Sequence, residues 1–278
     1  MISIITGQTA TGKTSKAIEL AKEKNGVLLN FDSRQIYKYL DIVTGKDREE
    51  GVTILGYDLV DPKEPFSSFD FVKYATRAID ELLEQGKHPI LVGGTYLYLS
   101  QLLYGQPQKL EPNWELREKL EDYSVQQLQE LLKSHDVDLF ASLNDSDKRN
   151  PHRLMRKIEK AEAGLTDRPL NTTPHYDIDR FDCYFFGEQE QLEETITQRV
   201  EMRLRQGAVE ETKDLLAKGY TKDDPGLKTI GYQQFIQFCD GEIPREEAVS
   251  SWIRAEIQYA KRQKTCMKKD RNLTIIEV

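Results

Sequence analysis

The chain has 278 residues, of which 38% are hydrophobic and 31% charged, and its formal net charge at neutral pH is −8. No apolar run approaches the roughly 20 residues that a membrane-spanning helix requires, so the composition argues against a membrane protein and predicts a globular one. The three cysteines lie far apart, without a CxxC pair or neighbouring histidines, which argues against a disulfide framework and a zinc site.

The N-terminal residues predict a strand, a glycine-rich turn and a helix in succession. Ile2 to Ile5 form an apolar run, the turn covers Gly7 to Lys13, and apolar residues then recur at helical spacing as far as Lys24. A second buried strand is predicted at Val27 to Phe31. Because the first strand begins almost at Met1, we expect no signal or transit peptide ahead of it and a cytoplasmic protein.

A second helix and a further strand follow in the next part of the chain. Phe69 to Gln85 has helical periodicity and stops at Gly86. Pro89 to Val92 is a short continuous apolar run that ends in Gly93 and Gly94. Strands that alternate with helices in this way predict a parallel sheet.

The pattern changes at about Pro107 to polar, charged helical segments, and no strand-like run appears before Phe181 to Phe186. Two long helices are predicted after it, one from Gln189 to Gly207 and on through Lys218, the other from Glu246 to Lys269. We therefore predict a core made of residues 1–108 and 180–278, with the C-terminal helices, and a helical insertion at residues 109–179.

Basic residues are concentrated in two short segments, although the chain as a whole is acidic. The first segment contains Lys148, Arg149, His152, Arg153, Arg156, Lys157 and Lys160, and the second contains Lys261, Arg262, Lys264, Lys268, Lys269 and Arg271. Local clusters of this kind bind nucleic-acid phosphates, but each of them is equally consistent with a solvated helix face.

A phosphate-binding loop (P-loop) lies between the first predicted strand and the first predicted helix. Its consensus G-x-x-x-x-G-K-[ST] is matched by Gly7, Gln8, Thr9, Ala10, Thr11, Gly12, Lys13 and Thr14. Backbone N–H groups of such a loop face a diphosphate or triphosphate, the lysine adds charge, and the hydroxyl of Thr14 can ligate Mg²⁺. The expected fold class is therefore α/β, a P-loop NTPase-like parallel sheet flanked by helices, with a helical insertion domain.

Asp32 is the acidic residue nearest to the end of a predicted strand. The carboxyl ends of parallel strands line the ligand crevice of such a sheet, so we expect Asp32 to open onto the same cleft as the P-loop. An aspartate at a strand-to-helix turn is also a common helix N-cap, and this alternative stays open.

The sequence resembles the tRNA dimethylallyltransferase family, also called tRNA isopentenyltransferases, over nearly its whole length. Besides the P-loop, the similar segments are Asp32 to Tyr37 with Asp41, Ile42 and Thr44, Gly93 to Thr95 with Leu97 to Leu99, Asn150 to Leu154 with Ile158 and Glu159, Arg199 and Val200, Gly231 and Tyr232, and Tyr259 to Gln263. Their order and spacing together make the resemblance specific.

This resemblance implies transfer of a dimethylallyl group from dimethylallyl diphosphate to N6 of adenosine 37 in the tRNA anticodon loop, with release of pyrophosphate and with Mg²⁺ as cofactor. It implies that Asp32 is the general base and that Thr9 and Lys13 act at the diphosphate. The diphosphate site would comprise the P-loop residues with Lys228 and Arg262. The tRNA-binding residues would be Asp32, Ser33, Arg34, Gln35, Arg149, Arg153, Arg156, Lys261 and Gln263, with the insertion clasping the anticodon stem-loop. We expect a monomer.

Several residues depart from the family's usual pattern. Gln8 stands where proline is usual, Lys228 replaces an arginine, and Tyr39 and Val43 replace small residues that are often glycine. Two alternatives remain at this point. One is a P-loop kinase for a small metabolite or nucleotide, with the arginines of the insertion as a lid, and the other is a non-catalytic RNA-binding relative. An enzyme that prenylates free AMP is disfavoured because the helical insertion is present.

Overall fold

The computed structural model describes residues 1–49, 51–165 and 173–278, and the chain divides into two compact units. The larger unit consists of Met1–Gly105 with Thr172–Val278, and the smaller of Gln106–Asn171. Residues 166–172, which fall within the predicted insertion, lie outside the described residues. Within the described residues no helix has the length and apolarity needed to cross a membrane.

The larger unit contains a six-stranded, wholly parallel sheet with the order β3-β2-β4-β1-β5-β6. Its strands are β1 (Ile2–Gly7), β2 (Gly26–Asn30), β3 (Ile54–Leu55), β4 (His88–Val92), β5 (Ile178–Phe185) and β6 (Thr274–Glu277). The chain leaves β1, forms β2 two positions away, and returns to place β4 between them. The carboxyl ends of β1, β4 and β2 therefore lie side by side at a topological switch point.

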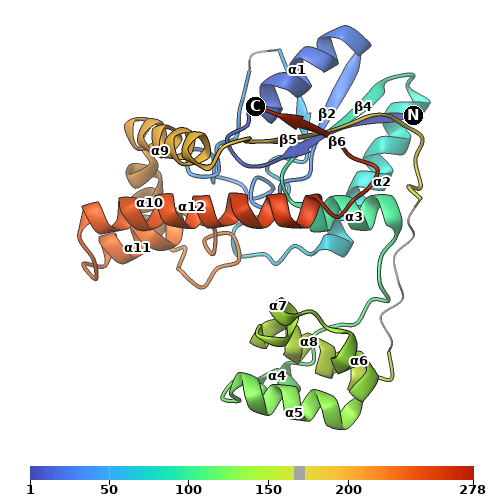
Figure 1. The fold of residues 1–278 in the computed structure, drawn as a ribbon. Coiled ribbons are helices and arrows are strands. Elements are labelled where there is room, and N and C mark those ends of the chain that lie inside the picture. The colour runs from blue at the N-terminus through green and yellow to red at the C-terminus, as the bar shows by residue number, and fades with distance from the viewer. Residues whose placement is uncertain (50, 166–172) are drawn as a thin grey trace. The chain divides into compact units, whose positions relative to one another are not determined.

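Helices cover both faces of this sheet (Figure 1). On one face α1 (Lys13–Lys24) packs through Ala17, Ile18 and Leu20 against apolar side chains of β1, β2 and β4. On the other face α2 (Ser68–Glu84) and α3 (Tyr96–Tyr104) bury Phe71 and Leu99 against the same strands. Burial on both faces explains why the central strands read as continuous apolar runs.

A layer of C-terminal helices forms a second core beside the sheet. It consists of α9 (Gln189–Arg205), α10 (Ala208–Ala217), α11 (Tyr232–Cys239) and α12 (Arg245–Met267). Trp252 and Phe235 are fully buried in this core and meet edge to face, with their ring centroids 5.5 Å apart. The helix predicted from Gln189 through Lys218 is in fact two helices, because Gly207 adopts a φ of 102° and breaks the run.

The smaller unit is helical over its described residues. Its helices are α4 (Trp114–Leu120), α5 (Val125–His135), α6 (Val137–Ser142), α7 (Asp145–Lys148) and α8 (Pro151–Glu162). Leu128 and Leu132 of α5 pack against Leu154 and Ile158 of α8 to form a small core of its own. Glu159 is buried beside this core and is paired with two arginines of the same unit, Arg117 and Arg156.

Candidate active site

Three functional segments lie together at the adjacent ends of β1, β2 and β4. The P-loop follows β1, Asp32 follows β2, and the Gly93-Gly94 pair follows β4. A cavity of about 230 Å³, here called the P-loop cavity, opens there and is lined by residues from all three segments. The expectation that Asp32 opens onto the same cleft as the P-loop is confirmed.

Five of the eight P-loop residues line this cavity, namely Thr9, Ala10, Gly12, Lys13 and Thr14. Ala10 and Gly12 have φ values of 68° and 73°, which turn successive backbone N–H groups toward one side. No side chain caps the N-terminus of α1. Its first N–H groups, with the positive end of the helix dipole, can therefore bind an anion.

The other three P-loop residues, Gly7, Gln8 and Thr11, do not line the cavity and contact the surrounding protein instead. A Cβ atom at Gly7 would lie 2.1 Å from the Tyr184 carbonyl oxygen, so no larger residue fits there. The side chain of Gln8 is 1% exposed; it donates to the Ala260 carbonyl at 3.2 Å and accepts from the Phe186 N–H at 2.9 Å. Thr11 donates its hydroxyl to the Gln8 carbonyl. Gln8 is thus a structural residue and its side chain is not available to a ligand.

Lys13 supplies a partly buried positive charge to the cavity. Burial and the neighbouring Arg199 lower the pKa of its amine to about 8, while the charge of Asp32 acts in the opposite direction. Its Nζ donates to the Gln8 carbonyl oxygen at 2.5 Å. A desolvated ammonium held beside open backbone amides favours a multiply charged anion as its partner.

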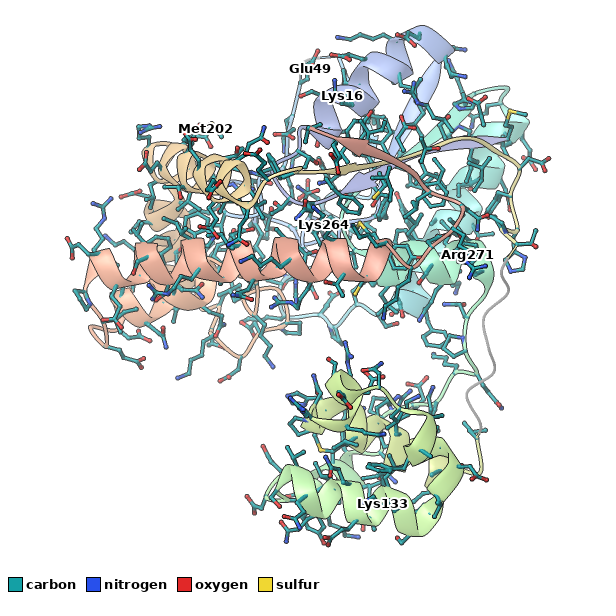
Figure 2. All side chains as sticks on the ribbon, in the orientation of Figure 1. Lys16, Glu49, Lys133, Met202, Lys264 and Arg271 are labelled. Carbon is teal, nitrogen blue, oxygen red and sulfur yellow. The ribbon has the colours of Figure 1, made fainter. Side chains whose placement is uncertain are left out.

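Arg199 of α9 adds a second cation to the P-loop cavity, which it lines, and its Nη1 donates to the Thr9 hydroxyl oxygen at 2.9 Å. Sequence reasoning gave this arginine no role, although it lies in a segment that carries the family resemblance. Met202, on the same helix and labelled in Figure 2, also lines the cavity. Asp47 lines the same cavity and was not predicted either. The polar loop that contains it has no periodicity from which the direction of its side chain could be inferred.

Gln263 of α12 joins the P-loop to the end of β4. Its Oε1 accepts from the Thr9 N–H at 2.8 Å, and its Nε2 donates to the Gly94 carbonyl at 3.0 Å. A Cβ atom at Gly94 would lie 2.3 Å from Nε2, so a larger residue there would displace the Gln263 amide. Predicted as a tRNA-binding residue, Gln263 is 5% exposed and lies in the wall of the P-loop cavity.

Asp32 stands between the P-loop cavity and a second cavity of about 400 Å³, here called the distal cavity. Its Oδ1 accepts from the Arg34 N–H at 2.9 Å and so closes a short turn. No helix begins at this turn, so the alternative of a helix N-cap is wrong. Thr9, Thr44 and Tyr259 also line both cavities, which places them with Asp32 in a shared wall.

Most of the other core residues that were predicted to bind the diphosphate or tRNA line the distal cavity. Ser33, Arg34, Lys228 and Arg262 line it, whereas Gln35 lines the P-loop cavity. Lys228 and Arg262, expected at the diphosphate, line the distal cavity and do not line the P-loop cavity.

A buried ion pair forms another part of the distal cavity's wall. Arg203, 4% exposed, lies with its Nη1 3.5 Å from Glu256 Oε1. Burial and Arg199 lower the pKa of Arg203 to about 10, against the charge of Glu256. This pair was not anticipated from the sequence.

Glu211 of α10 holds the loop that follows Asp32 through hydrogen bonds to its backbone. Its carboxylate accepts hydrogen bonds at 2.7–3.0 Å from the N–H groups of Asp41, Ile42 and Val43, and another at 2.6 Å from the Tyr232 hydroxyl. This anchor holds Thr44 in the shared wall, and Gln35 closes the loop by donating to the Thr44 carbonyl.

The basic residues of the insertion differ in their availability. Arg149 is exposed, and Arg153 is exposed and paired with Asp147. Arg156 instead donates to the buried carboxylate of Glu159 at 2.8 Å, and Arg117 donates to the same carboxylate at 2.6 Å. Burial alone would raise the pKa of Glu159, but these two hydrogen bonds hold it below its ordinary value.

Known proteins match nearly the whole chain. A family model described as IPP transferase matches residues 35–270, and one described as isopentenyl transferase matches residues 1–56. The chain is 34% identical to the tRNA dimethylallyltransferase of Endomicrobium trichonymphae, over 96% of this chain and 91% of that protein. It is 36% identical to the tRNA dimethylallyltransferase of Alkaliphilus oremlandii, over 97% of this chain and 89% of that protein.

Solved structures give the same result. The chain is similar to the tRNA isopentenylpyrophosphate transferase of Bacillus halodurans, with a TM-score of 0.73 and 32% identity over 99% of this chain and 89% of that one. It is also similar to the tRNA isopentenylpyrophosphate transferase of Staphylococcus epidermidis, with a TM-score of 0.71 and 29% identity over 99% of this chain and 92% of that one.

Proposed function

The chain belongs to the IPP transferase family, that of the tRNA dimethylallyltransferases, and from this premise we propose that its two adjoining cavities carry out the transfer. The reaction moves the dimethylallyl group of dimethylallyl diphosphate to N6 of adenosine 37 in the anticodon loop of tRNA. The observation that carries the proposal is that Asp32 and Thr9 line both cavities, because a transferase must bring two substrates together at one point.

The diphosphate of the donor occupies the P-loop cavity. The open N–H groups of Gly12, Lys13 and Thr14, the Lys13 amine and the Arg199 guanidinium surround that space. Asp32 follows β2, two strands away from β1, which corresponds to about 10 Å at the usual spacing of strands. This separation leaves room for the reacting carbon between the phosphate cradle and the carboxylate.

The adenine enters from the distal cavity with its exocyclic amine toward Asp32. Adenine N6 is a weak nucleophile because its lone pair is delocalised into the ring, so its attack must be coupled to loss of a proton. The bond between N6 and the allylic carbon forms, the bond between that carbon and the diphosphate oxygen breaks, and Asp32 takes the N6 proton. The electron pair of the broken bond leaves with pyrophosphate.

Positively charged groups line the cavity in which the leaving group gains negative charge. Lys13, Arg199 and the N-terminus of α1 stabilise the departing pyrophosphate, and Arg199 also orients the Thr9 hydroxyl at the wall between the two substrates. Arg262 and Lys228 lie across that wall, where their charge acts on the RNA side and attracts the phosphates beside the adenine.

Magnesium fits the donor set of the P-loop cavity. Thr14 offers a hydroxyl and Asp47 a carboxylate, and the described residues form no cluster of three acidic, histidine or cysteine ligands. Mg²⁺ retains several waters and is commonly held by one or two protein oxygens together with substrate phosphates. When bound, it would neutralise charge on the diphosphate.

The tRNA substrate is bound by the core and by the insertion. Reaching the distal cavity requires the adenine to leave its stack, which is a usual step for enzymes that modify a base. Arg149 and Arg153 of the insertion, with Arg34 of the core, supply cations for the stem-loop phosphates. Arg156 contributes indirectly, because its pairing with Glu159 maintains the fold of α8.

The test is product analysis. The protein is incubated with Mg²⁺, dimethylallyl diphosphate and unmodified tRNA, and the digested nucleosides are examined by mass spectrometry. N6-dimethylallyl adenosine at position 37, with one pyrophosphate released per modified adenosine, is the expected result. Formation of ADP from ATP with a small-molecule acceptor, and no allyl transfer, would support a kinase instead. Stem-loop binding without any transfer would support a non-catalytic relative.

A further inference from the structure

An exposed tyrosine occupies a strained backbone position in the loop after Asp32. Tyr39 has a φ of 66°, in the left-handed region that bulky residues seldom adopt, and its side chain is 49% exposed. About half of the side chain faces solvent, so burial in the core does not account for this conformation. Strained residues of this kind cluster at functional sites, so the position calls for a role outside the core.

Tyr39 belongs to a cluster of two aromatic rings and two lysines, here called the Tyr39 patch. The ring centroids of Tyr39 and Tyr220 are 6.4 Å apart, with an angle of 42° between the planes. The amine of Lys218 lies 5.3 Å from the Tyr39 centroid, and that of Lys63 lies 5.3 Å from the Tyr220 centroid. The Tyr220 hydroxyl donates to Asp61 at 2.8 Å, which fixes its ring.

The patch is linked to the distal cavity through contacts between the chain segments that carry it. Arg34 lines that cavity and donates to the Pro225 carbonyl at 3.4 Å. The next residue, Gly226, donates its N–H to the Pro62 carbonyl at 2.9 Å, and Pro62 precedes Lys63 of the patch. The two segments that carry Tyr39 and Tyr220, residues 32–44 and 220–230, therefore also line the cavity that receives the adenine.

We propose that the Tyr39 patch is a stacking platform for a base that neighbours the target adenine in the single-stranded loop. The inference rests on the proposed function. Rings exposed between cations suit single-stranded RNA, because every base can stack on an aromatic face and every linkage carries a phosphate for a lysine. A base displaced from its own stack by the entry of its neighbour into the distal cavity regains stacking on Tyr39.

The first test compares Tyr39→Gly with Tyr39→Trp in the full-length protein. Glycine removes the ring and relieves the backbone strain, so this variant should fold, whereas tryptophan preserves an aromatic face. The Gly variant should bind an anticodon stem-loop RNA about tenfold more weakly, within the range for loss of one stacked base, and the Trp variant should stay within about twofold of the wild type. Pyrophosphate affinity should be the same in all three proteins.

A fluorescent base locates the contact. With 2-aminopurine beside the target adenine, binding to the wild type should alter its emission in a manner typical of stacking on a ring, and the Gly variant should not reproduce that change. Lys218→Gln should lower the salt dependence of binding, whereas Lys213→Gln, at an exposed lysine of α10, should leave it unchanged.

The outcomes separate this inference from the proposed function. Wild-type transfer activity with equal RNA affinity in the Gly variant would overturn the platform and leave the function intact. Equal weakening in the Gly and Trp variants would assign the effect to the backbone of the loop and also overturn it. A wild-type protein that neither binds the stem-loop nor transfers the allyl group would remove the proposed function itself.

Discussion

The amide oxygen of Gln263 accepts a hydrogen bond from the backbone N–H of Thr9 at 2.8 Å, although 254 residues separate the two in sequence. The other end of the same amide donates to the Gly94 carbonyl. One buried side chain thus holds the P-loop, the end of β4 and α12 in a fixed relation. The position of Thr9, in the wall between the two cavities, depends on it.

Gln263→Leu should therefore weaken both the fold and the diphosphate site. The change leaves the Thr9 N–H and the Gly94 carbonyl without their partner, which costs about 1–3 kcal/mol for each buried group that stays unsatisfied. Urea unfolding measures this loss. Gln263→Glu keeps the acceptor for Thr9 but adds negative charge to the P-loop cavity, so it should bind pyrophosphate less tightly than the Leu variant. Wild-type pyrophosphate affinity in the Glu variant would show that Gln263 does not face the diphosphate.

Pyrophosphate binding should depend on pH through Lys13. A bound diphosphate favours the ammonium form, and the pKa of Lys13 is lowered to about 8, chiefly by burial and by Arg199. Affinity should thus be highest below pH 8 and fall, by at most about tenfold per pH unit, as the pH rises above it. Lys13→Arg stays charged throughout and should lose this component. Calorimetric titration of both proteins in the same buffers cancels the ionisation of pyrophosphate itself; parallel pH profiles would contradict the assignment.

The same shift in the pKa of Lys13 affects stability without ligand, with a definite sign. Because the folded pKa lies below the ordinary value of 10.5, the unfolded chain binds more protons between about pH 8 and 10.5. The destabilisation from the buried charge is complete below pH 8 and disappears above pH 10.5. Lys13→Met should thus be more stable than the wild type at pH 7, by on the order of 1–3 kcal/mol, and lose that advantage near pH 10.5. A constant difference across this range would argue against a charge effect.

Much of the fold could be predicted because its signals are local. The strand, P-loop and helix at the N-terminus and the strand that ends at Gly93 have clear periodicity, and the structure contains all of them. The errors occurred where tertiary contacts determine whether a helix or strand forms and where it ends. The sequence around Gly207 indicates a tolerated glycine within one helix, whereas the helix breaks there. Helix α11 was not predicted because it has only eight residues. Strand β6 was not predicted because it is short and partly exposed and is defined by its pairing with β5.

The site was predictable to the extent that motifs fix backbone geometry. The P-loop consensus fixes the local backbone that brings Thr9 and Lys13 to a cavity. By contrast, Gln8 and Arg156 were assigned to ligands from their sequence positions, and the structure uses both side chains internally. Arg203 could not be anticipated, because an arginine on an amphipathic helix gives no sign of being buried. Partners in distant parts of the chain, such as Glu256, determine such positions.

Two arginines of the insertion should respond differently to neutralisation. Arg156→Gln removes one of two partners of the buried Glu159 and should destabilise the insertion by roughly 3 kcal/mol at most, since Arg117 remains. Arg149→Gln, at an exposed site, should leave stability unchanged but weaken stem-loop binding and reduce its salt slope by about 0.7 to 0.9. Limited proteolysis and salt-dependent binding separate the two effects. Unchanged affinity in the Arg149 variant would make this residue part of a solvated face only.

The sharpest prediction concerns Asp32, whose carboxylate takes the N6 proton in the proposed reaction. Asp32→Asn removes the base and keeps an oxygen that can accept from the Arg34 N–H, so the turn should survive. The variant should melt near the wild-type temperature and bind tRNA and pyrophosphate normally. Its single-turnover transfer should be about 10² to 10⁴ times slower, which is the usual contribution of a positioned general base.

Asp47 provides the matched control, because it is the other carboxylate that lines the P-loop cavity and it does not line the distal cavity. On the proposed geometry it lies on the diphosphate side, so Asp47→Asn should change the Mg²⁺ concentration needed for half-maximal rate and leave the rate at saturating Mg²⁺ within about tenfold of the wild type. Asp32→Asn should show the reverse pattern, a rate loss that Mg²⁺ does not restore. A rate near wild type in the Asp32 variant, together with a large loss in the Asp47 variant, would transfer the role of base to Asp47. It would also reverse the orientation of the two substrates, because the adenine amine would then have to reach the cavity that holds the P-loop amides.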